Sequence, residues 1–152
     1  MADIPDSYKP IVIKPPFSMS ERLIDLTPIL EKAKSDHKPI LLYMGAQDCP
    51  PCREYEQFLV RHQSELAAAY EPWTVVEVRT WLRGPKVIFQ SGDQRYSIVE
   101  FKAALGDKNK VFTWPYWWLI SPDMRQIKQL PQGSKHFLDV DNQKALLRVG
   151  KQ

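Results

Sequence analysis

Cysteine is scarce in this sequence, and its scarcity argues against several kinds of site. Only Cys49 and Cys52 occur among 152 residues. A structural zinc ion takes four ligands, but no second closely spaced cysteine pair is present. The three histidines, His37, His62 and His136, show no paired-ligand spacing, so zinc is disfavoured. A purely structural disulfide is disfavoured as well, because a bridge across so short a loop removes little entropy from the unfolded chain.

Long apolar runs and runs of like charge are also missing. Purely apolar segments such as 40–44 are far too short to cross a bilayer. The net charge is +3, and basic residues are interspersed with acidic ones, so no nucleic-acid partner is expected. Residues 1–5 lack both the basic and the apolar region of an export signal. Met1 is therefore either the natural start or the replacement for a signal that was removed.

The composition is ordinary for one globular domain, with 43% hydrophobic residues. Residues 1–18 hold four prolines and few periodic apolar residues, which predicts an extended N-terminal arm. Within the arm, Ile11, Val12 and Ile13 are a candidate edge strand. Such an arm often follows an export signal or a tether, but it equally suits a strand laid along a sheet edge. Residues 19–152 are expected to form a single domain.

The two cysteines follow the clearest buried strand of the chain. Residues 40–44 are apolar without alternation, which predicts a strand buried on both faces of an α/β sheet. The motif Cys49-Pro50-Pro51-Cys52 comes next, and apolar residues at helical spacing follow it. Prolines are tolerated in a first helical turn, where backbone N–H groups lack partners. Those N–H groups and the helix dipole favour a thiolate, so the arrangement predicts redox chemistry.

Periodicity and breaker residues predict the other elements. Helices are expected at 27–38, 50–70, 97–105 and 141–150, and strands at 73–78, 87–89, 111–120 and 125–130. A strand, a crossover helix and a strand in succession imply a parallel pair. Thr27 and Asp141 are assigned as N-caps, and Ser97 and Glu100 have the spacing of a capping box. Glu56 is placed on the charged outer side of the 50–70 helix.

Three further expectations concern an irregular segment, the last helix and the two adjacent tryptophans. Residues 79–95 are expected to be irregular apart from the short strand at 87–89. In the last helix, Ala145, Leu146 and Val149 are expected to face inward, with Gly150 as the terminator. Strand alternation sends the adjacent tryptophans at 117 and 118 to opposite faces, and at least one of them is expected in the core.

The order of these elements, together with the cysteine motif, resembles the thioredoxin superfamily from about residue 27 to the C-terminus. The likeness also rests on Trp114-Pro115 at the start of a central strand and on the Ser-Pro-Asp turn at 121–123. It implies an α/β, thioredoxin-like fold, with a central mixed β-sheet flanked by helices. It also implies a cis Trp114–Pro115 bond facing the cysteines, since only X-Pro bonds take the cis form at low cost.

The Pro-Pro-Cys-Arg continuation and the proline-rich arm look most like one bacterial branch of the family. This branch comprises periplasmic or membrane-tethered CPPC-type thiol:disulfide oxidoreductases, which reduce cysteines during cytochrome c maturation and similar tasks. Asp48 stands where cytosolic thioredoxins usually have a tryptophan, and Tyr43 stands where they keep a buried carboxylate. The stretch before Pro115 is also longer than in a minimal thioredoxin. A periplasmic location is therefore expected, with the cytoplasm as the alternative.

The resemblance implies a thiol:disulfide oxidoreductase that reduces protein disulfides. Cys49 would attack as a thiolate, and Cys52 would resolve the mixed disulfide. Trp114, Pro115 and Tyr116 would line the substrate groove. The implied partners are cysteine-containing protein substrates and a thiol–disulfide electron donor or acceptor protein, with a possible membrane tether upstream. No metal or organic cofactor is expected.

Two alternative functions stay open. The same dithiol chemistry runs as net oxidation or isomerisation if the reduction potential is higher, within a range of about −270 to −120 mV among relatives. A thioredoxin-fold binding module without turnover, or a carrier that holds Cu(I) between Cys49 and Cys52, is the other alternative. The carrier is the weaker hypothesis, because two thiolates with no methionine or histidine expected nearby make a poor copper site.

Glu77 is the last candidate residue. It stands between Val76 and Val78 in a strand otherwise suited to burial, and Glu is seldom buried without a partner. An ion pair with Arg79 or another cation, or an exposed strand edge, is one interpretation. The family alignment instead places Glu77 beneath the cysteine motif, where its carboxylate would accept the proton of Cys52 with a raised pKa. Both interpretations stay open at this point.

Overall fold

The central sheet of the protein is mixed. A computed structural model describes residues 3–148. Within them β1 (Ile11–Ile13), β3 (Ile40–Ala46), β4 (Thr74–Thr80) and β7 (Tyr116–Ile120) pair in the order β1-β4-β3-β7. β1, β4 and β3 run parallel, and β7 runs antiparallel to β3. β3 is buried along its whole length, as its non-alternating sequence predicts. The expected central mixed sheet is therefore confirmed.

A second, smaller sheet was not expected from the sequence. β2 (Glu21–Asp25), β5 (Lys86–Ser91) and β6 (Gln94–Ser97) pair in the order β2-β5-β6. β5 and β6 form a hairpin around Gly92, whose φ of 61° suits glycine. The prediction of an irregular 79–95 segment is thus wrong beyond the strand at 87–89. Polar residues in β5 and β6 interrupt the alternation of apolar and polar residues that would predict a strand. Their partner β2 also lies far away in the sequence.

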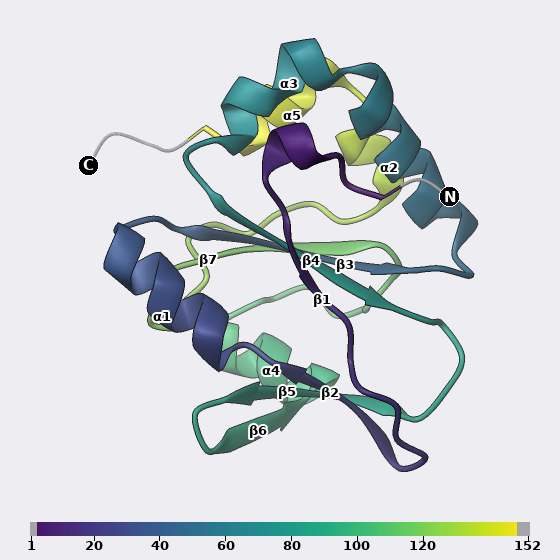
Figure 1. The fold of residues 1–152 in the computed structure, drawn as a ribbon, viewed down its shortest axis with the longest axis vertical. Coiled ribbons are helices and arrows are strands. Elements are labelled where there is room, and N and C mark those ends of the chain that lie inside the picture. The colour runs from purple at the N-terminus through teal and green to yellow at the C-terminus, as the bar shows by residue number, and fades with distance from the viewer. Residues whose placement is uncertain (1–2, 149–152) are drawn as a thin grey trace.

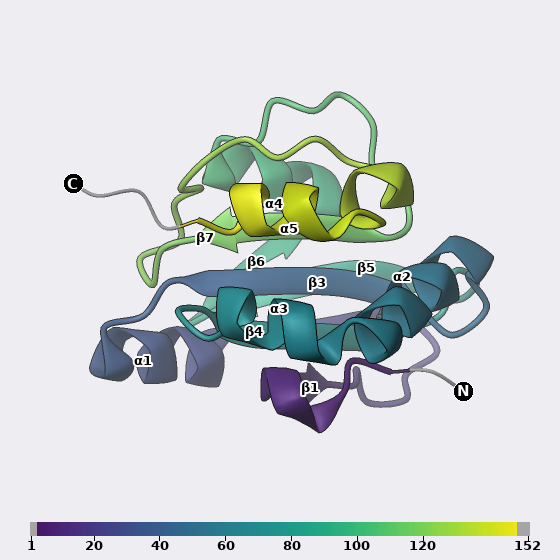
Figure 2. The same ribbon diagram turned by 90° about the horizontal axis from the view of Figure 1, so that it is seen from above.

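Helices and the small sheet form the outer layers (Figures 1 and 2). One face of the central sheet is covered by α2 (Pro50–Arg61), α3 (Gln63–Tyr70), α5 (Val140–Leu146) and the 3-10 helices η1 (Asp6–Tyr8) and η2 (Ser134–Phe137). The other face is covered by α1 (Thr27–Asp36), α4 (Ile98–Leu105) and the small sheet. Within residues 3–148 this makes an α/β fold with two mixed sheets and five α-helices, which is compatible with a thioredoxin-like fold.

Each face of the central sheet has its own apolar core, because strand residues point alternately to the two faces. Trp118 packs edge-on against Phe101 in the core between the central sheet, α1, α4 and the small sheet. Trp117 stacks on Phe137 in the core beneath α2 and α3, with ring centroids 3.7 Å apart. Both tryptophans are buried. They go to opposite faces, as strand alternation predicts.

The single helix predicted over 50–70 is two helices. His62 separates α2 from α3 in a non-helical conformation, with φ −117° and ψ 29°. Its backbone N still donates to Phe58 O, and its ring Nδ1 lies 2.8 Å from Glu65 Oε1. The apolar stripe continues across the break, which explains why the sequence pattern predicts one helix.

The strand predicted over 125–130 does not form. This stretch has only an isolated bridge between Ile120 and Gln126. Gln126 N donates to Leu105 O, and Gln126 Nε2 donates to Gly106 O. Pairing with β7 is limited to the bridge and to the bond from Ile127 N to Leu119 O at 2.8 Å, while Gln126 satisfies carbonyl groups at the C-terminus of α4 that would otherwise lack partners.

Two predicted N-caps are displaced. α5 is capped by Asp139, whose Oδ1 accepts from Asn142 N at 2.8 Å, rather than by Asp141. At α1 the N-cap residue is Leu26, and Thr27 is already helical. The predicted capping box of α4 does form, with both reciprocal hydrogen bonds present.

The inward face of α5 differs accordingly. Leu146 is partly buried against the core, as expected, but Gln143 and Leu147 are the buried residues and Ala145 is exposed. The expected inward residue Val149 and the expected terminator Gly150 lie outside the described residues.

The N-terminal arm packs against the rest of the domain. Ile4 and Tyr8 are buried in the core beneath α2 and α3. Tyr8 Oη donates to Leu59 O at 2.7 Å. β1 then runs along the edge of the central sheet beside β4, which confirms the predicted edge strand. The arm therefore joins the same core as the helix that carries the cysteines.

Candidate functional site

The two cysteines lie at the junction of β3 and α2. Cys49 is the N-cap residue of α2, and Pro50 and Pro51 occupy the first turn. Cys49 and Cys52 are joined as a disulfide, with their Cα atoms 5.3 Å apart. Cys52 N donates to Cys49 Sγ at 3.2 Å. In the reduced protein this N–H group and the helix N-terminus favour a thiolate on Cys49.

The cysteine pair is almost completely enclosed. Cys49 is 2% exposed and Cys52 is 0% exposed, so Cys49 is the one that reaches the surface. Ala46 at the end of β3 and the partly buried Trp114 pack against the pair. The surface next to Cys49 therefore includes the indole of Trp114.

Trp114 and Pro115 lie at the same end of the sheet as the cysteines. β7 is antiparallel to β3, and its first residue, Tyr116, pairs with Met44 near the end of β3. The Trp114–Pro115 peptide bond is cis, the isomer expected from the sequence. The strand begins at Tyr116 and not at residue 111, since Pro115 has no N–H group to donate to a ladder.

Tyr116 lies in the core and not on a groove. Its side chain is fully buried. Tyr116 Oη donates to Asp107 Oδ2 at 2.6 Å, and Trp118 Nε1 donates to the same oxygen at 2.9 Å. Of the three residues expected to bind substrate, Trp114 contacts the cysteines, Pro115 follows it, and Tyr116 anchors the strand behind them.

Polar contacts fasten the turn between β3 and α2. Asp48 Oδ1 accepts from Leu82 N at 2.7 Å, and this hydrogen bond lowers the pKa of Asp48. Gln47 N donates to Thr80 O at 2.9 Å, and Arg53 hydrogen-bonds the carbonyl of Gln47. The cysteine motif is thereby tied to β4 and to the loop that follows it.

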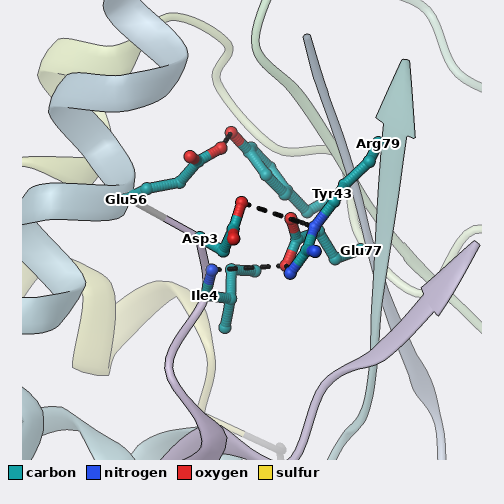
Figure 3. Close-up of polar contacts among 6 residues, drawn as sticks. All are labelled: Asp3, Ile4, Tyr43, Glu56, Glu77 and Arg79. Carbon is teal, nitrogen blue, oxygen red and sulfur yellow. Dashed lines mark hydrogen bonds and ion pairs between the residues drawn. The ribbon is translucent and has the colours of Figure 1, made fainter. Parts of the chain in front are cut away.

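Glu77 is buried on β4, opposite Tyr43 of β3. Its carboxylate accepts from Arg79 Nε at 2.6 Å and from Arg79 Nη2 at 3.3 Å (Figure 3). It also accepts from Ile4 N at 3.2 Å, and Arg79 lies 3.5 Å from a carboxylate oxygen of Asp3. The ion pair that explains Glu77 structurally is therefore present.

The carboxyl of Glu56 lies beside this ion pair. The prediction that Glu56 faces outward from the helix is therefore wrong. Glu56 on α2 is only 7% exposed. Tyr43 Oη donates to Glu56 Oε2 at 2.7 Å (Figure 3). Glu56 follows Cys52 by four residues, so the two side chains share one face of α2. This spacing is the signal available in the sequence. Tyr43 thus donates a hydrogen bond to a carboxyl of α2, that of Glu56.

The carboxyl of Glu56 titrates close to neutral pH. Burial raises its pKa to about 7; the hydrogen bond from Tyr43 opposes this shift, and the charge of Glu77 adds to it. A hollow of about 10 Å³, roughly the size of one water molecule, is lined by Glu56, Glu77, Arg79 and Ala46. Ala46 lines the hollow and also packs against the cysteine pair. An acid with this pKa beside a thiol suits proton transfer at neutral pH.

Residues 3–148 hold neither a cluster of metal ligands nor a membrane-spanning helix. No group of three or more His, Cys, Asp or Glu side chains in this range is arranged to hold a metal ion. No helix of the same range has the length and apolar character needed to cross a bilayer.

Comparison with known proteins does not assign a family to the chain. No protein-family model matches the chain, and no curated protein matches it. What can be concluded about function therefore rests on the fold and on the arrangement of Cys49, Cys52 and their neighbours.

Proposed function

We propose that the protein is a thioredoxin-like thiol:disulfide oxidoreductase that reduces protein disulfides. The observation that carries this proposal is the Cys49–Cys52 pair, held at disulfide distance at the N-terminus of α2. Opening and closing this bond transfers two electrons without any cofactor. The hydrogen bond from Cys52 N to Cys49 Sγ supports Cys49 as the attacking thiolate.

The reaction consists of two thiol–disulfide exchanges. The Cys49 thiolate attacks one sulfur of the substrate disulfide, a mixed disulfide forms, and the other substrate sulfur leaves as a thiolate. Cys52 then loses its proton and attacks Cys49 Sγ, the Cys49–Cys52 bond forms, and the second substrate thiolate leaves. The substrate gains two electrons and takes up two protons, and the protein is oxidised. A dithiol donor protein restores the reduced state by the reverse exchanges.

Glu56 is the proposed acceptor for the proton of Cys52. It lies one helical turn beyond Cys52 and has a pKa of about 7. Glu77, the acceptor expected from the sequence, has both oxygens engaged by Arg79 and Ile4. Glu77 therefore acts as a positioning residue, because its charge helps to hold the pKa of Glu56 near neutrality.

Trp114 and Pro115 are proposed to line the groove that receives the substrate beside Cys49. Trp114 is partly exposed and packs against the cysteine pair, which supports this role. Tyr116 enters the proposal only as the buried anchor of the segment.

The direction of electron flow and the setting belong to the same proposal. The resemblance to the reducing bacterial branch favours reduction in the periplasm, with a possible tether upstream. The reduction potential of the Cys49–Cys52 couple decides the direction: a value near about −270 mV supports reduction, and one near about −120 mV supports net oxidation.

Two serine variants test the assignment of the cysteines. Cys52→Ser should trap mixed disulfides with substrate proteins, because the resolving thiol is missing, whereas Cys49→Ser should trap none. Non-reducing gels separate the two outcomes, and equal trapping would contradict the roles.

For the function itself, pre-reduced wild-type protein should be oxidised by hydroxyethyl disulfide faster than free dithiothreitol is at the same pH. A rate no faster than that of the free dithiol would favour a binding module without turnover.

A further inference from the structure

An exposed apolar hollow lies beside the cysteine motif and takes no part in the chemistry described above. Pro15, Pro16 and Phe17 of the β1–β2 loop line it together with Trp81 of the β4–β5 loop. Its volume is about 360 Å³. Phe17 is 94% exposed and Trp81 is 49% exposed. Large aromatic side chains that line a hollow and are exposed to solvent are typical of an interaction site.

The hollow is next to the redox pair because the β4–β5 loop is bonded to the residue before Cys49. Leu82 N donates to Asp48 Oδ1 at 2.7 Å, and Trp81 precedes Leu82 in the chain. The β3–α2 junction, the β1–β2 loop and the β4–β5 loop all lie at one end of the central sheet (Figure 1). Trp81 is therefore one residue from the hydrogen bond that holds Asp48, the residue before Cys49.

The hollow also carries positive charge. Arg22 and Arg83 line it, and no lining residue is acidic. Within residues 3–148 neither guanidinium forms an ion pair. Arg22 is held rigidly, because its Nε donates to Pro85 O at 2.6 Å and its Nη1 donates to Thr80 Oγ1 at 3.1 Å. The charge of Asp48 acts on both guanidinium groups, but its Oδ1 accepts a hydrogen bond from Leu82 N.

We propose that this hollow docks an extended segment of the protein substrate in which an acidic residue stands next to a large apolar one. The proposal rests on the proposed function and names the substrate class for it. The apolar side chain covers Trp81 and Phe17, and the carboxylate pairs with Arg83 and accepts from Nη2 of Arg22, whose Nε and Nη1 are bound by Pro85, Thr80 and Trp81. Arginine suits this role because its planar guanidinium pairs with both oxygens of a carboxylate. A basic segment is repelled by the same two charges.

The test uses synthetic peptides that each contain one disulfide and differ only in the flank beside it. The flanks are Glu-Phe, Lys-Phe and Glu-Ala, and hydroxyethyl disulfide serves as the reference without a flank. Pre-reduced protein should react with the Glu-Phe peptide at least about fivefold faster than with the Lys-Phe peptide at low ionic strength. The preference should shrink in high salt, since exposed charges are screened.

Two variants separate the apolar contact from the charged contact between the peptide and the hollow. Arg83→Glu should reverse the order of the Glu-Phe and Lys-Phe peptides. Trp81→Ala should remove the advantage of Glu-Phe over Glu-Ala, which we expect to be about tenfold, as for aromatic residues at the centre of an interface. Val99→Ala, an exposed apolar position on α4, is the matched control and should keep all ratios of the wild type.

A peptide with the Glu-Phe flank and serine in place of both cysteines measures docking without chemistry. Its binding, followed by fluorescence anisotropy, should be lost in Arg83→Glu and retained in Val99→Ala. Absence of binding to the wild type, together with equal rate constants for the Glu-Phe and Lys-Phe peptides, would overturn the docking proposal. Failure of the wild type to react with hydroxyethyl disulfide would instead overturn the proposed function, and the anisotropy result would still decide whether the hollow binds acidic segments.

Discussion

At the scale of single residues, Glu56 and Glu77 have the same side chain in two different settings. Glu77 is paired with Arg79 through two hydrogen bonds. Among the described residues 3–148, Glu56 receives the hydroxyl of Tyr43 and forms no ion pair, so its charged form has no cation of this range in contact with it. Burial therefore raises the pKa of Glu56 to about 7. Glu77 is thus a carboxylate neutralised by Arg79, whereas Glu56 is a carboxyl that exchanges its proton near neutral pH.

Glu56→Gln is expected to slow the resolving step about a hundredfold near pH 7, because glutamine cannot accept the proton of Cys52. In the wild type the rate of this step should rise with pH through about 7, the pKa of Glu56. In the variant the rise should move towards about 8.5, the ordinary pKa of a thiol. Single-turnover reduction of hydroxyethyl disulfide across pH 5 to 9, read as release of the second thiol, measures the step.

Two variants serve as controls for this experiment. Glu54→Gln, at an exposed position on the same helix, should follow the wild type. Glu77→Gln should move the rise to lower pH, because the charge of Glu77 raises the pKa of Glu56. Superimposable profiles of wild type and Glu56→Gln would mean that Glu56 is structural only.

The same pKa shift has a consequence for stability. The folded protein keeps a proton on Glu56 up to its pKa of about 7, whereas the unfolded chain loses it near the ordinary pKa of 4.5. The free energy of unfolding should therefore decrease as pH rises from about 4.5 to about 7. Urea denaturation of Glu56→Gln should lack this part of the decrease.

At the scale of elements, Asp107 holds together the segments that place Trp114 and Pro115. It follows α4, and it accepts hydrogen bonds from Tyr116 and Trp118 of β7. It also accepts from Gln129 Nε2 at 2.8 Å. Although burial raises the pKa of Asp107, these hydrogen bonds outweigh it and lower the pKa below its ordinary value. The long connection before β7 is thus fixed at both of its ends.

Asp107→Ala should lower the free energy of unfolding by about 2–4 kcal/mol, because it leaves Tyr116 Oη and Trp118 Nε1 buried without a partner. Since the folded pKa of Asp107 is lowered, its contribution is present above the unfolded pKa of about 3.8 and is lost as pH falls below it. Urea denaturation at pH 7 and pH 3 measures both effects, with the larger difference at pH 7. Glu31→Ala, exposed on α1, should stay within about 0.5 kcal/mol of the wild type. Equal midpoints for Asp107→Ala and the wild type would contradict the role.

At the scale of the whole molecule, the N-terminal arm closes the core beside the redox site. Ile4 N donates to Glu77, and Asp3 pairs with Arg79. Tyr8 Oη donates to Leu59 O on α2. The arm therefore joins the first residues of the chain to β4 and to the helix that carries the cysteines, and it covers the two carboxyls (Figure 3).

Ile4→Ala should lower the free energy of unfolding by about 2–4 kcal/mol, because it leaves a cavity in the core beneath α2 and α3. It should also move the pH–rate rise below about 7, since reduced burial lets the pKa of Glu56 fall. Chemical denaturation and the single-turnover profile measure the two effects. Val99→Ala, outside this core, should change neither, and an unchanged profile in Ile4→Ala would separate the arm from the site.

Some features were determined by the sequence alone, because residues close together in the chain decide them. The cysteine motif after a buried strand places Cys49 at the start of a helix, and Ser97 with Glu100 closes a capping box. Continuous apolar character identifies β3 as a central strand. In each case the partner lies within a few residues, so no distant contact is needed to predict the outcome.

Other features were decided only by the tertiary structure, because their partners lie far away in the chain. β2 becomes a strand by pairing with β5. The 125–130 segment pairs with β7 only at its start, because Gln126 satisfies carbonyl groups at the end of α4. Glu56 is buried because Tyr43 and the N-terminal arm close over it. Local propensities differ by a few tenths of a kcal/mol to about 1 kcal/mol, and a buried hydrogen bond or side chain supplied by a distant segment outweighs them.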